Sequence, residues 1–234
     1  MMKKYLSYGG GVNSTAMILL LTDEGWEFES IYVDHGCDWP ETREYVRMMR
    51  ESWGYPITVL TPNVEGCTTL EQYLKKWNMI PSRVLRFCTD KFKVRVINSY
   101  VQKPCFSLIG FSTDEEDRAK MTLEKGIENR FPLLEYGVDR NGCEKIIKDH
   151  HLPVPIKSGC WFCPFQRIGQ WKKLRRLHPD LFCRAKTLEG NEQKARIERG
   201  QEPLYLAGRP LDEIVKEKQG RLWAEDHPPC QCGF

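Results

Sequence analysis

Lys4-Tyr5-Leu6-Ser7-Tyr8 runs directly into Gly9-Gly10-Gly11-Val12-Asn13-Ser14-Thr15, and this stretch decides the fold. The first five residues have the composition of a strand, and a helix is expected over residues 14–24. Glycines between a strand and a helix let the backbone approach a phosphate, while the helix N-terminus supplies positive potential. The stretch therefore predicts an α/β fold with a phosphate-binding loop after its first strand.

The loop has a simpler interpretation, a tight strand-to-helix turn capped by Asn13 or Ser14. Three glycines exceed what a cap needs, which favours phosphate binding. No Gly-Lys-Ser/Thr follows, and the spacing is not Gly-x-Gly-x-x-Gly, so the motifs of kinases and of dinucleotide-binding proteins are excluded. The predicted nucleotide-binding residues of the loop are Ser7, Gly9, Gly10, Gly11, Asn13, Ser14 and Thr15.

Apolar runs and amphipathic stretches alternate through the first part of the chain, which is typical of a parallel sheet. Further strands are expected over 30–33, 57–60 and 105–110, and the segment 130–134 is expected to lead into the last part of the sheet. Beyond residue 137 the sequence is rich in helix-forming, cysteine and basic residues. We therefore predict a Rossmann-like α/β nucleotide-binding domain over 1–137 and a mostly helical, Cys-rich region over 138–234 packed on it.

The composition restricts the classes of protein to which the chain can belong. The 234 residues are 41% hydrophobic and 29% charged, with a net charge of +3, which is ordinary for a globular protein with a core. No apolar run approaches the eighteen or so residues of a membrane span. A strand pattern begins almost at the first residue, so no signal peptide is expected and we predict a cytoplasmic protein. Ten cysteines in a reducing compartment indicate metal ligation or redox chemistry.

Two cysteines at Cys160-x-x-Cys163 can chelate one metal centre from a tight turn. Cys88 lies between basic residues expected to favour its thiolate. Cys143 precedes Cys160 by seventeen residues, beyond an expected turn at Gly142. We predict that these four cysteines bind a metal at the nucleotide edge of the sheet; the ligands alone do not separate an iron–sulfur cluster from structural zinc.

Charged residues gather around Cys88 and again near residue 115. Basic side chains suited to phosphate, sulfate or a nucleic-acid backbone are Arg83, Arg86, Lys91, Lys93 and Arg95. Asp114, Glu115 and Arg118 are expected on the opposite rim of the cleft, where the carboxylates either hold Mg²⁺ or orient Arg118.

Several blocks, taken in order, resemble the phosphoadenosine-phosphosulfate (PAPS) reductase family of the PP-loop superfamily. They are the glycine loop, Asp34-His35-Gly36 with Pro40-Glu41-Thr42, Arg86-Phe87-Cys88-Thr89 with Lys91 and Lys93, Ile109-Gly110-Phe111 with Asp114, Glu115 and Arg118, and Lys157-Ser158-Gly159-Cys160-Trp161-Phe162-Cys163. The loop departs from the family's Ser-Gly-Gly-Lys-Asp-Ser at Gly9, Val12 and Asn13. The resemblance implies ATP or PAPS as ligand, with Asp34 at the end of the strand that faces the adenosine.

The resemblance also implies a [4Fe–4S] cluster on the cysteines, with zinc as the alternative. The tail Gln231-Cys232-Gly233-Phe234 is similar to the family's catalytic C-terminal motif. Cys232 is thus either a mobile nucleophile or, like Cys230, a fourth metal ligand in place of Cys143; the alternative is a tail with two incidental thiols. Cys232 and Arg118 are the catalytic candidates.

Two chemistries fit the resemblance: sulfonucleotide reduction, and ATP-dependent sulfur transfer to a nucleic acid. The first needs a thiol reductant and the second a sulfur donor protein. The basic helix expected over 171–179 favours a nucleic-acid partner, or is simply a solvated face. The alternative class is a non-catalytic nucleotide- and zinc-binding module, for which the missing loop lysine argues. No membrane partner is expected.

Overall fold

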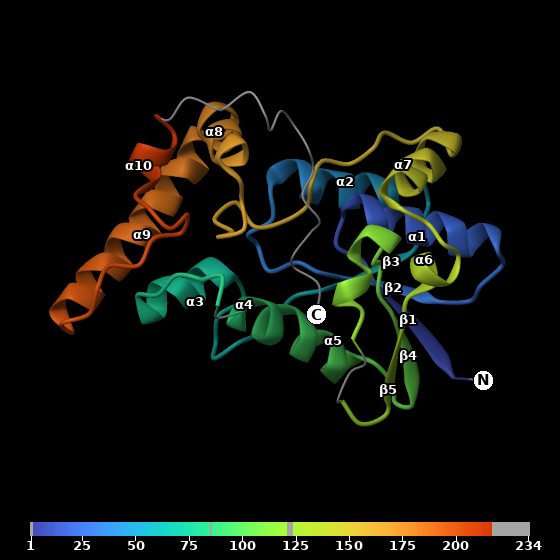
Figure 1. Ribbon diagram of the computed structural model, residues 1–234. Helices are drawn as coiled ribbons and strands as arrows, with labels where there is room; N and C mark the ends of the chain where they lie inside the picture. The colour runs from blue at the N-terminus through green and yellow to red at the C-terminus, as the bar shows by residue number, and fades with distance from the viewer. Residues whose placement is uncertain (1, 85, 121–123, 217–234) are drawn as a thin grey trace.

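The computed structural model describes residues 2–84, 86–120 and 124–216, and its centre is a five-stranded parallel sheet (Figure 1). The strand order is β3-β2-β1-β4-β5, with every neighbouring pair parallel. The strands are β1 Lys3–Ser7, β2 Glu29–Val33, β3 Ile57–Leu60, β4 Cys105–Leu108 and β5 Ile127–Arg130. This confirms the predicted Rossmann-like α/β fold.

Helices cover both faces of the sheet, because successive strand side chains point to opposite sides. Leu6 packs with α1 (Val12–Asp23), α2 (Pro40–Glu51) and α7 (Arg140–Asp149), whereas its neighbour Tyr5 packs with α5 (Arg95–Tyr100) on the other face. Figure 1 shows α1 and α7 side by side, and they form the most extensive helix pair of the described chain. The sheet is therefore buried on both sides, as a parallel sheet requires.

A separate core lies beyond the edge of the sheet. Its helices are α3 (Leu70–Trp77), α8 (Ile168–Leu177), α9 (Pro179–Glu198) and the short α10 (Leu211–Ile214), which Figure 1 draws in teal, orange and red. Trp171 and Leu174 of α8 are fully buried there against residues as early as Cys37 and Trp39. The C-terminal helices thus share a core with N-terminal segments, and α7 belongs to the sheet's own core. The division at residue 137 stays a prediction.

Short helical segments complete the described chain: α4 Phe87–Thr89, a π-helical turn Asp90–Val94, a 3₁₀ segment Thr113–Arg118 and α6 Pro132–Glu135. None of the helices in residues 2–84, 86–120 and 124–216 has the length and apolar character needed to cross a bilayer.

Two local expectations were wrong. The last strand ends at Arg130 instead of following the segment 130–134, because Pro132 occupies the first turn of α6 and lacks the N–H that a strand ladder needs. Gly142 is not a turn but lies in the first turn of α7. The Asp139 side chain accepts its N–H at 2.6 Å and caps the helix.

Candidate functional site

A cavity lies at the carboxyl ends of β1 and β4, where the strand order reverses direction. Ligands of open α/β sheets bind at this position because the two crossovers leave on opposite sides. The cavity encloses about 990 Å³, its open mouth included. We call it the switch-point cavity, and its wall comes from Ser7 to Gly9, Gly11 to Ser14, Ile31 to Val33, Lys93, Ile97, Ile109 to Phe111, Glu115, Arg118, Arg140 and Lys157 to Gly159.

The three glycines of the loop differ in what surrounds the position that a side chain would take. Gly10 has a left-handed φ of +67°, and a methyl group on it would lie 2.8 Å from Thr42 Cγ2 of α2. A methyl group on Gly11 would lie 2.6 Å from Ser158 Oγ, so the 157–159 segment packs directly on the loop. Only around Gly9 does the space stay open, with no described atom within 4 Å of the position that a methyl group would take. Gly9 is thus the glycine that leaves room for a ligand.

Replacing Gly10 by alanine is expected to lower the free energy of unfolding by about 2–4 kcal/mol. The new methyl group adds left-handed strain and contacts Thr42 and Val46 of α2 at under 3 Å. Gly25→Ala is the matched control, because Gly25 has a φ of +68° with no described atom within 4 Å of its methyl position; it should cost only about 1–2 kcal/mol. Urea denaturation measures both, and equal losses would show that α2 does not press on the loop.

Polar groups of the loop divide between the cavity and the protein. The hydroxyl of Ser14 accepts the Gly9 N–H at 3.2 Å and donates to the Gly11 carbonyl at 3.2 Å, which fixes the turn. Thr15 is fully buried, with its hydroxyl 3.3 Å from that of Tyr8, and does not line the cavity. Ser7, Gly9, Gly11, Asn13 and Ser14 do line it. The structure therefore brings five of the seven predicted loop residues to the cavity wall.

The side chain of Asn13 connects the loop to two arginines. Its amide nitrogen donates to Glu115 Oε2 at 2.9 Å, and its oxygen accepts from Arg140 Nη1 at 3.0 Å. Glu115 in turn forms an ion pair with Arg118. The predicted rim residues Glu115 and Arg118 thus lie in the wall, whereas the Asp114 carboxylate accepts the backbone N–H of Arg140 at 2.7 Å and lies outside it.

Sequence reasoning missed two cations of this wall, Arg140 and Lys157. With Lys93 and Arg118 they give four cationic lining side chains against one acidic one, Glu115. The signal for Lys157 was its position at the start of the cysteine motif. Arg140 had no local signal, because only the docking of α7 on α1 brings it to the loop.

A second cavity adjoins the first and contains three of the predicted metal ligands. Cys88, Cys160 and Cys163 line it together with His35 and Arg86; we call it the cysteine cavity. Lys93 and Gly159 belong to the walls of both cavities. A group bound at the thiols would therefore lie next to the end of a ligand in the switch-point cavity.

Cys143 lies elsewhere. It is fully buried on α7 in the core shared with α1, and its charged neighbours are Arg140, Asp139, Asp114 and Glu115. The physical reason is that α7 begins at Arg140, so Cys143 follows the helix into the sheet's core instead of a turn toward Cys160. Three of the four predicted thiols line one cavity, and the structure does not bring Cys143 to them. Cys230 and Cys232 lie outside the described residues.

Backbone pairing holds the Cys160 turn against the end of β2. Asp38 and Cys160 form an antiparallel bridge, in which the Trp39 N–H donates to Gly159 O at 3.2 Å and the Trp161 N–H to Cys37 O at 3.0 Å. Gly159 has a φ of +150°. This pairing brings a segment about 120 residues later in the chain to the β2–α2 loop.

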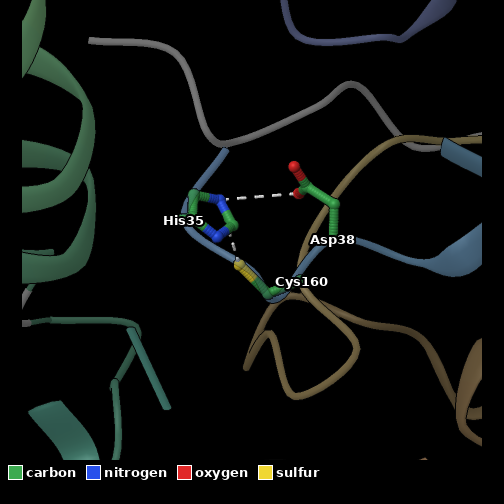
Figure 2. Close-up of side chains that lie close together, drawn as sticks. All are labelled: His35, Asp38 and Cys160. Carbon is green, nitrogen blue, oxygen red and sulfur yellow. Dashed lines mark hydrogen bonds and ion pairs between the residues drawn. The ribbon is translucent and has the colours of Figure 1, made fainter. Parts of the chain in front are cut away.

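His35, Asp38 and Cys160 meet at that bridge (Figure 2). His35 Nε2 lies 3.5 Å from Asp38 Oδ1 and 3.8 Å from Cys160 Sγ, and Tyr32 donates its hydroxyl to Asp38 Oδ2 at 2.7 Å. Burial lowers the pKa of His35 and strongly raises the pKa of the Cys160 thiol. Burial works to raise the pKa of Asp38, but His35 and Lys93 outweigh it and the net direction is down. The trio joins an imidazole, a carboxylate and a thiol, the donor types that zinc prefers.

The remaining predicted residues have other surroundings. Burial raises the pKa of the Cys88 thiol, and the opposing effect of the Lys93 charge does not offset it. In the absence of a metal, the expectation that the thiolate of Cys88 is favoured was therefore wrong. Arg86 stacks over Phe165 in the cysteine cavity. Lys91 lies away from both cavities and pairs with Glu65 and the Tyr73 hydroxyl. Asp34 accepts the Gly36 N–H and pairs with Arg43 outside the switch-point cavity.

Comparison with known proteins agrees with this arrangement. The sequence profile of the phosphoadenosine phosphosulfate reductase domain matches residues 3–148. The chain belongs to this family. The matched part contains the whole sheet, the glycine loop and all of α7 except its last residue, whereas Cys160 and Cys163 lie beyond it. Most of the wall of the switch-point cavity therefore comes from the family domain.

Relatives at the level of whole chains are distant. An uncharacterised protein of Methanocaldococcus jannaschii is 25% identical over an alignment of 190 residues, and the match covers 75% of this chain and 45% of that protein. The chain therefore spans less than half the length of this relative. The crystal structure of PAPS reductase from Candida auris in a phosphate complex has a TM-score of 0.53 and 15% identity, covering 69% of this chain and 82% of that one. A predicted tRNA methyltransferase subunit of M. jannaschii reaches a TM-score of only 0.33 at 13% identity, covering 89% of this chain and 94% of that one.

Proposed function

We propose that this chain is an enzyme that binds ATP or PAPS in the switch-point cavity and performs sulfur chemistry at the cysteine cavity. The observation that carries the proposal is the shared wall: Lys93 and Gly159 line both cavities. A reactive sulfur at the thiols and the phosphate chain of a nucleotide would then be neighbours. Membership of the family supports nucleotide binding, and the adjacency of the two cavities supports sulfur chemistry beside the phosphate chain.

The chain's own residues supply what a nucleotide needs. The first turn of α1 presents N–H groups to the cavity, and the helix dipole adds positive potential. Gly9 leaves space for the phosphate chain, while Phe111 and Ile97 offer apolar surface to a base or ribose. Arg118 is held by Glu115 and is the cation we assign to orienting the reacting group.

Cys88, Cys160 and Cys163 would hold the metal centre, a [4Fe–4S] cluster by family resemblance or zinc as the alternative. A cluster would supply electron transfer or bind a sulfur atom; zinc would stabilise a thiolate. Cys232 is the proposed nucleophile if the reaction is sulfonucleotide reduction. The exposed Lys173, Arg175 and Arg176 of α8 suit a nucleic-acid acceptor if the reaction is ATP-dependent sulfur transfer.

Anaerobic purification followed by turnover assays tests this function. Protein supplied with iron and sulfide is assayed for sulfite release from PAPS in the presence of a dithiol reductant. It is also assayed for pyrophosphate release from ATP, with and without tRNA, in the presence of a sulfur donor. Sulfite release selects reduction, and pyrophosphate release that depends on tRNA selects sulfur transfer. Stoichiometric nucleotide binding without either product would support the non-catalytic module and overturn the enzyme.

Arg140→Met is expected to weaken ATP binding roughly 10- to 100-fold, because a charge-assisted contact with a phosphate is lost. Adenosine should bind the variant as it binds the wild type. Lys145→Met is the control, since this side chain lies on the same helix, is mostly exposed and pairs only with Asp149 among the described residues. Calorimetry measures the affinities of each variant for ATP and for adenosine. An equal loss of affinity for adenosine would mean that Arg140 only supports the loop through Asn13.

A further inference from the structure

The distances from His35 to Asp38 and to Cys160 are close to those between ligands of one metal ion. Bond lengths to zinc of about 2.0–2.3 Å in tetrahedral geometry separate two ligand atoms by roughly 3.4 Å for nitrogen and oxygen and roughly 3.6 Å for nitrogen and sulfur. The observed separations from His35 Nε2 are 3.5 Å to the carboxylate and 3.8 Å to the sulfur. All three donor atoms lie within 4.8 Å of one another.

Direct hydrogen bonding explains these separations less well. An N–H···O bond is usually about 2.7–3.2 Å long, so the 3.5 Å between His35 Nε2 and Asp38 Oδ1 is too long for a good hydrogen bond. The short bond of Asp38 is the 2.7 Å contact from Tyr32. A ligating carboxylate is typically held in this way by a second group that fixes its orientation.

The site formed by these three residues is buried and adjoins the cysteine cavity on one side. His35 and Asp38 are 1% and 4% exposed, and the backbone bridge between Asp38 and Cys160 fixes the two chain segments. His35 and Cys160 also line the cysteine cavity, where the thiols of Cys88 and Cys163 lie. An ion held by the three ligands would therefore turn its fourth position toward those thiols and toward Gly159.

We propose that His35, Asp38 and Cys160 bind a single zinc-type divalent ion, with its fourth position facing the cysteine cavity. The proposal refines the metal centre of the proposed function. Of the four predicted cysteines it keeps only Cys160 as a ligand and adds an imidazole and a carboxylate from the β2–α2 loop, a donor set that suits one borderline ion better than an iron–sulfur cluster.

One contact must change when the ion binds. His35 Nδ1 now accepts the Cys37 N–H at 3.3 Å, which places the ring proton on Nε2. Coordination through Nε2 moves the proton to Nδ1, so this long contact opens. The ion takes over the role of the proton between the imidazole and Asp38, and it also stabilises the Cys160 thiolate.

The test measures metal content and cobalt spectra of the full chain with three variants. His35→Ala and Asp38→Asn are each expected to lower zinc affinity at least about 100-fold, because outer contacts alone change it by about 10- to 100-fold. Asp38→Asn keeps the size of the side chain and an acceptor for Tyr32, so it reports on ligation even if the alanine variant folds poorly. The matched control is His150→Ala, which breaks a surface pair with Asp23 at 3.2 Å.

Cobalt substituted into the wild type should give the tetrahedral thiolate spectrum of one ion per chain, and His35→Ala should abolish it. Unchanged metal content in both His35→Ala and Asp38→Asn overturns the proposal, as does wild type that carries a cluster with an identical spectrum in both variants. Nucleotide binding is measured on the same samples by calorimetry. Zinc bound without nucleotide would refute the proposed function alone, and nucleotide bound without zinc would refute the ion alone.

Discussion

Cys160→Ser is expected to remove the metal from the purified protein, whereas Cys143→Ser should retain it. Cys160 lies at the meeting point of the cysteine cavity and the His35–Asp38 pair, so every ligand set that the structure supports includes it. A serine hydroxyl is a poor replacement for a thiolate on a soft or borderline metal. The loss in affinity should exceed the roughly 10- to 100-fold that changes in outer contacts cause.

Cys143 gives the opposite expectation. Its side chain is fully buried between α7 and α1, where a hydroxyl in place of the thiol costs about 1–3 kcal/mol. Cys143→Ser should therefore lower the unfolding midpoint and leave the metal content per folded chain unchanged. Metal analysis and thermal unfolding of both variants separate the two effects. Metal lost from both variants would return the ligand set to the one expected from sequence, which includes Cys143 and Cys160, and metal kept by Cys160→Ser would contradict both ligand sets.

The sheet and the glycine loop could be predicted from the sequence because the residues that specify each segment lie within that segment. The strand composition before Gly9, the proline that starts α2 and the apolar run 57–60 each specify their own segment, and the structure has strands or helices there. The switch-point position of the loop depends on the strand order β3-β2-β1-β4-β5, which these local signals do not specify.

The ligand set could not be predicted because it depends on packing between distant segments. Cys143 was grouped with Cys160 on spacing, but the Asp139 cap starts a helix that turns this side chain into the core. His35 lies 125 residues before Cys160 in the sequence. Only the antiparallel bridge between residues 38 and 160 brings it to the thiol.

The glycine loop shows how one pattern serves two purposes. Gly10 and Gly11 are required by α2 and by Ser158, which press on the loop from two sides, and only Gly9 leaves open space. The sequence interpretation as a phosphate loop and the interpretation as a tight turn are thus both partly right. The strained residues fix the loop so that the first turn of α1 and Gly9 can face the cavity.

Trp161→Ala is expected to lower the free energy of unfolding by about 3–5 kcal/mol, the usual cost of truncating a buried tryptophan. The ring is 2% exposed, meets Phe162 edge-to-face at 4.5 Å between centroids and lies under the Arg184 guanidinium at 5.0 Å. These contacts fix the Cys160 turn to the core formed by α3, α8 and α9. Urea denaturation measures the loss.

Trp77→Ala is the matched control, because this ring is 49% exposed on α3 and donates its indole N–H to Glu65 at 3.1 Å on the surface. Its replacement should cost about 1 kcal/mol or less. Folded Trp161→Ala should still bind metal, because the bridge to Cys37 uses the backbone N–H of residue 161 and not its ring. If metal affinity fell in proportion to stability, the ring itself would be what positions Cys160, and the backbone pairing would be too weak to hold the ligand in place.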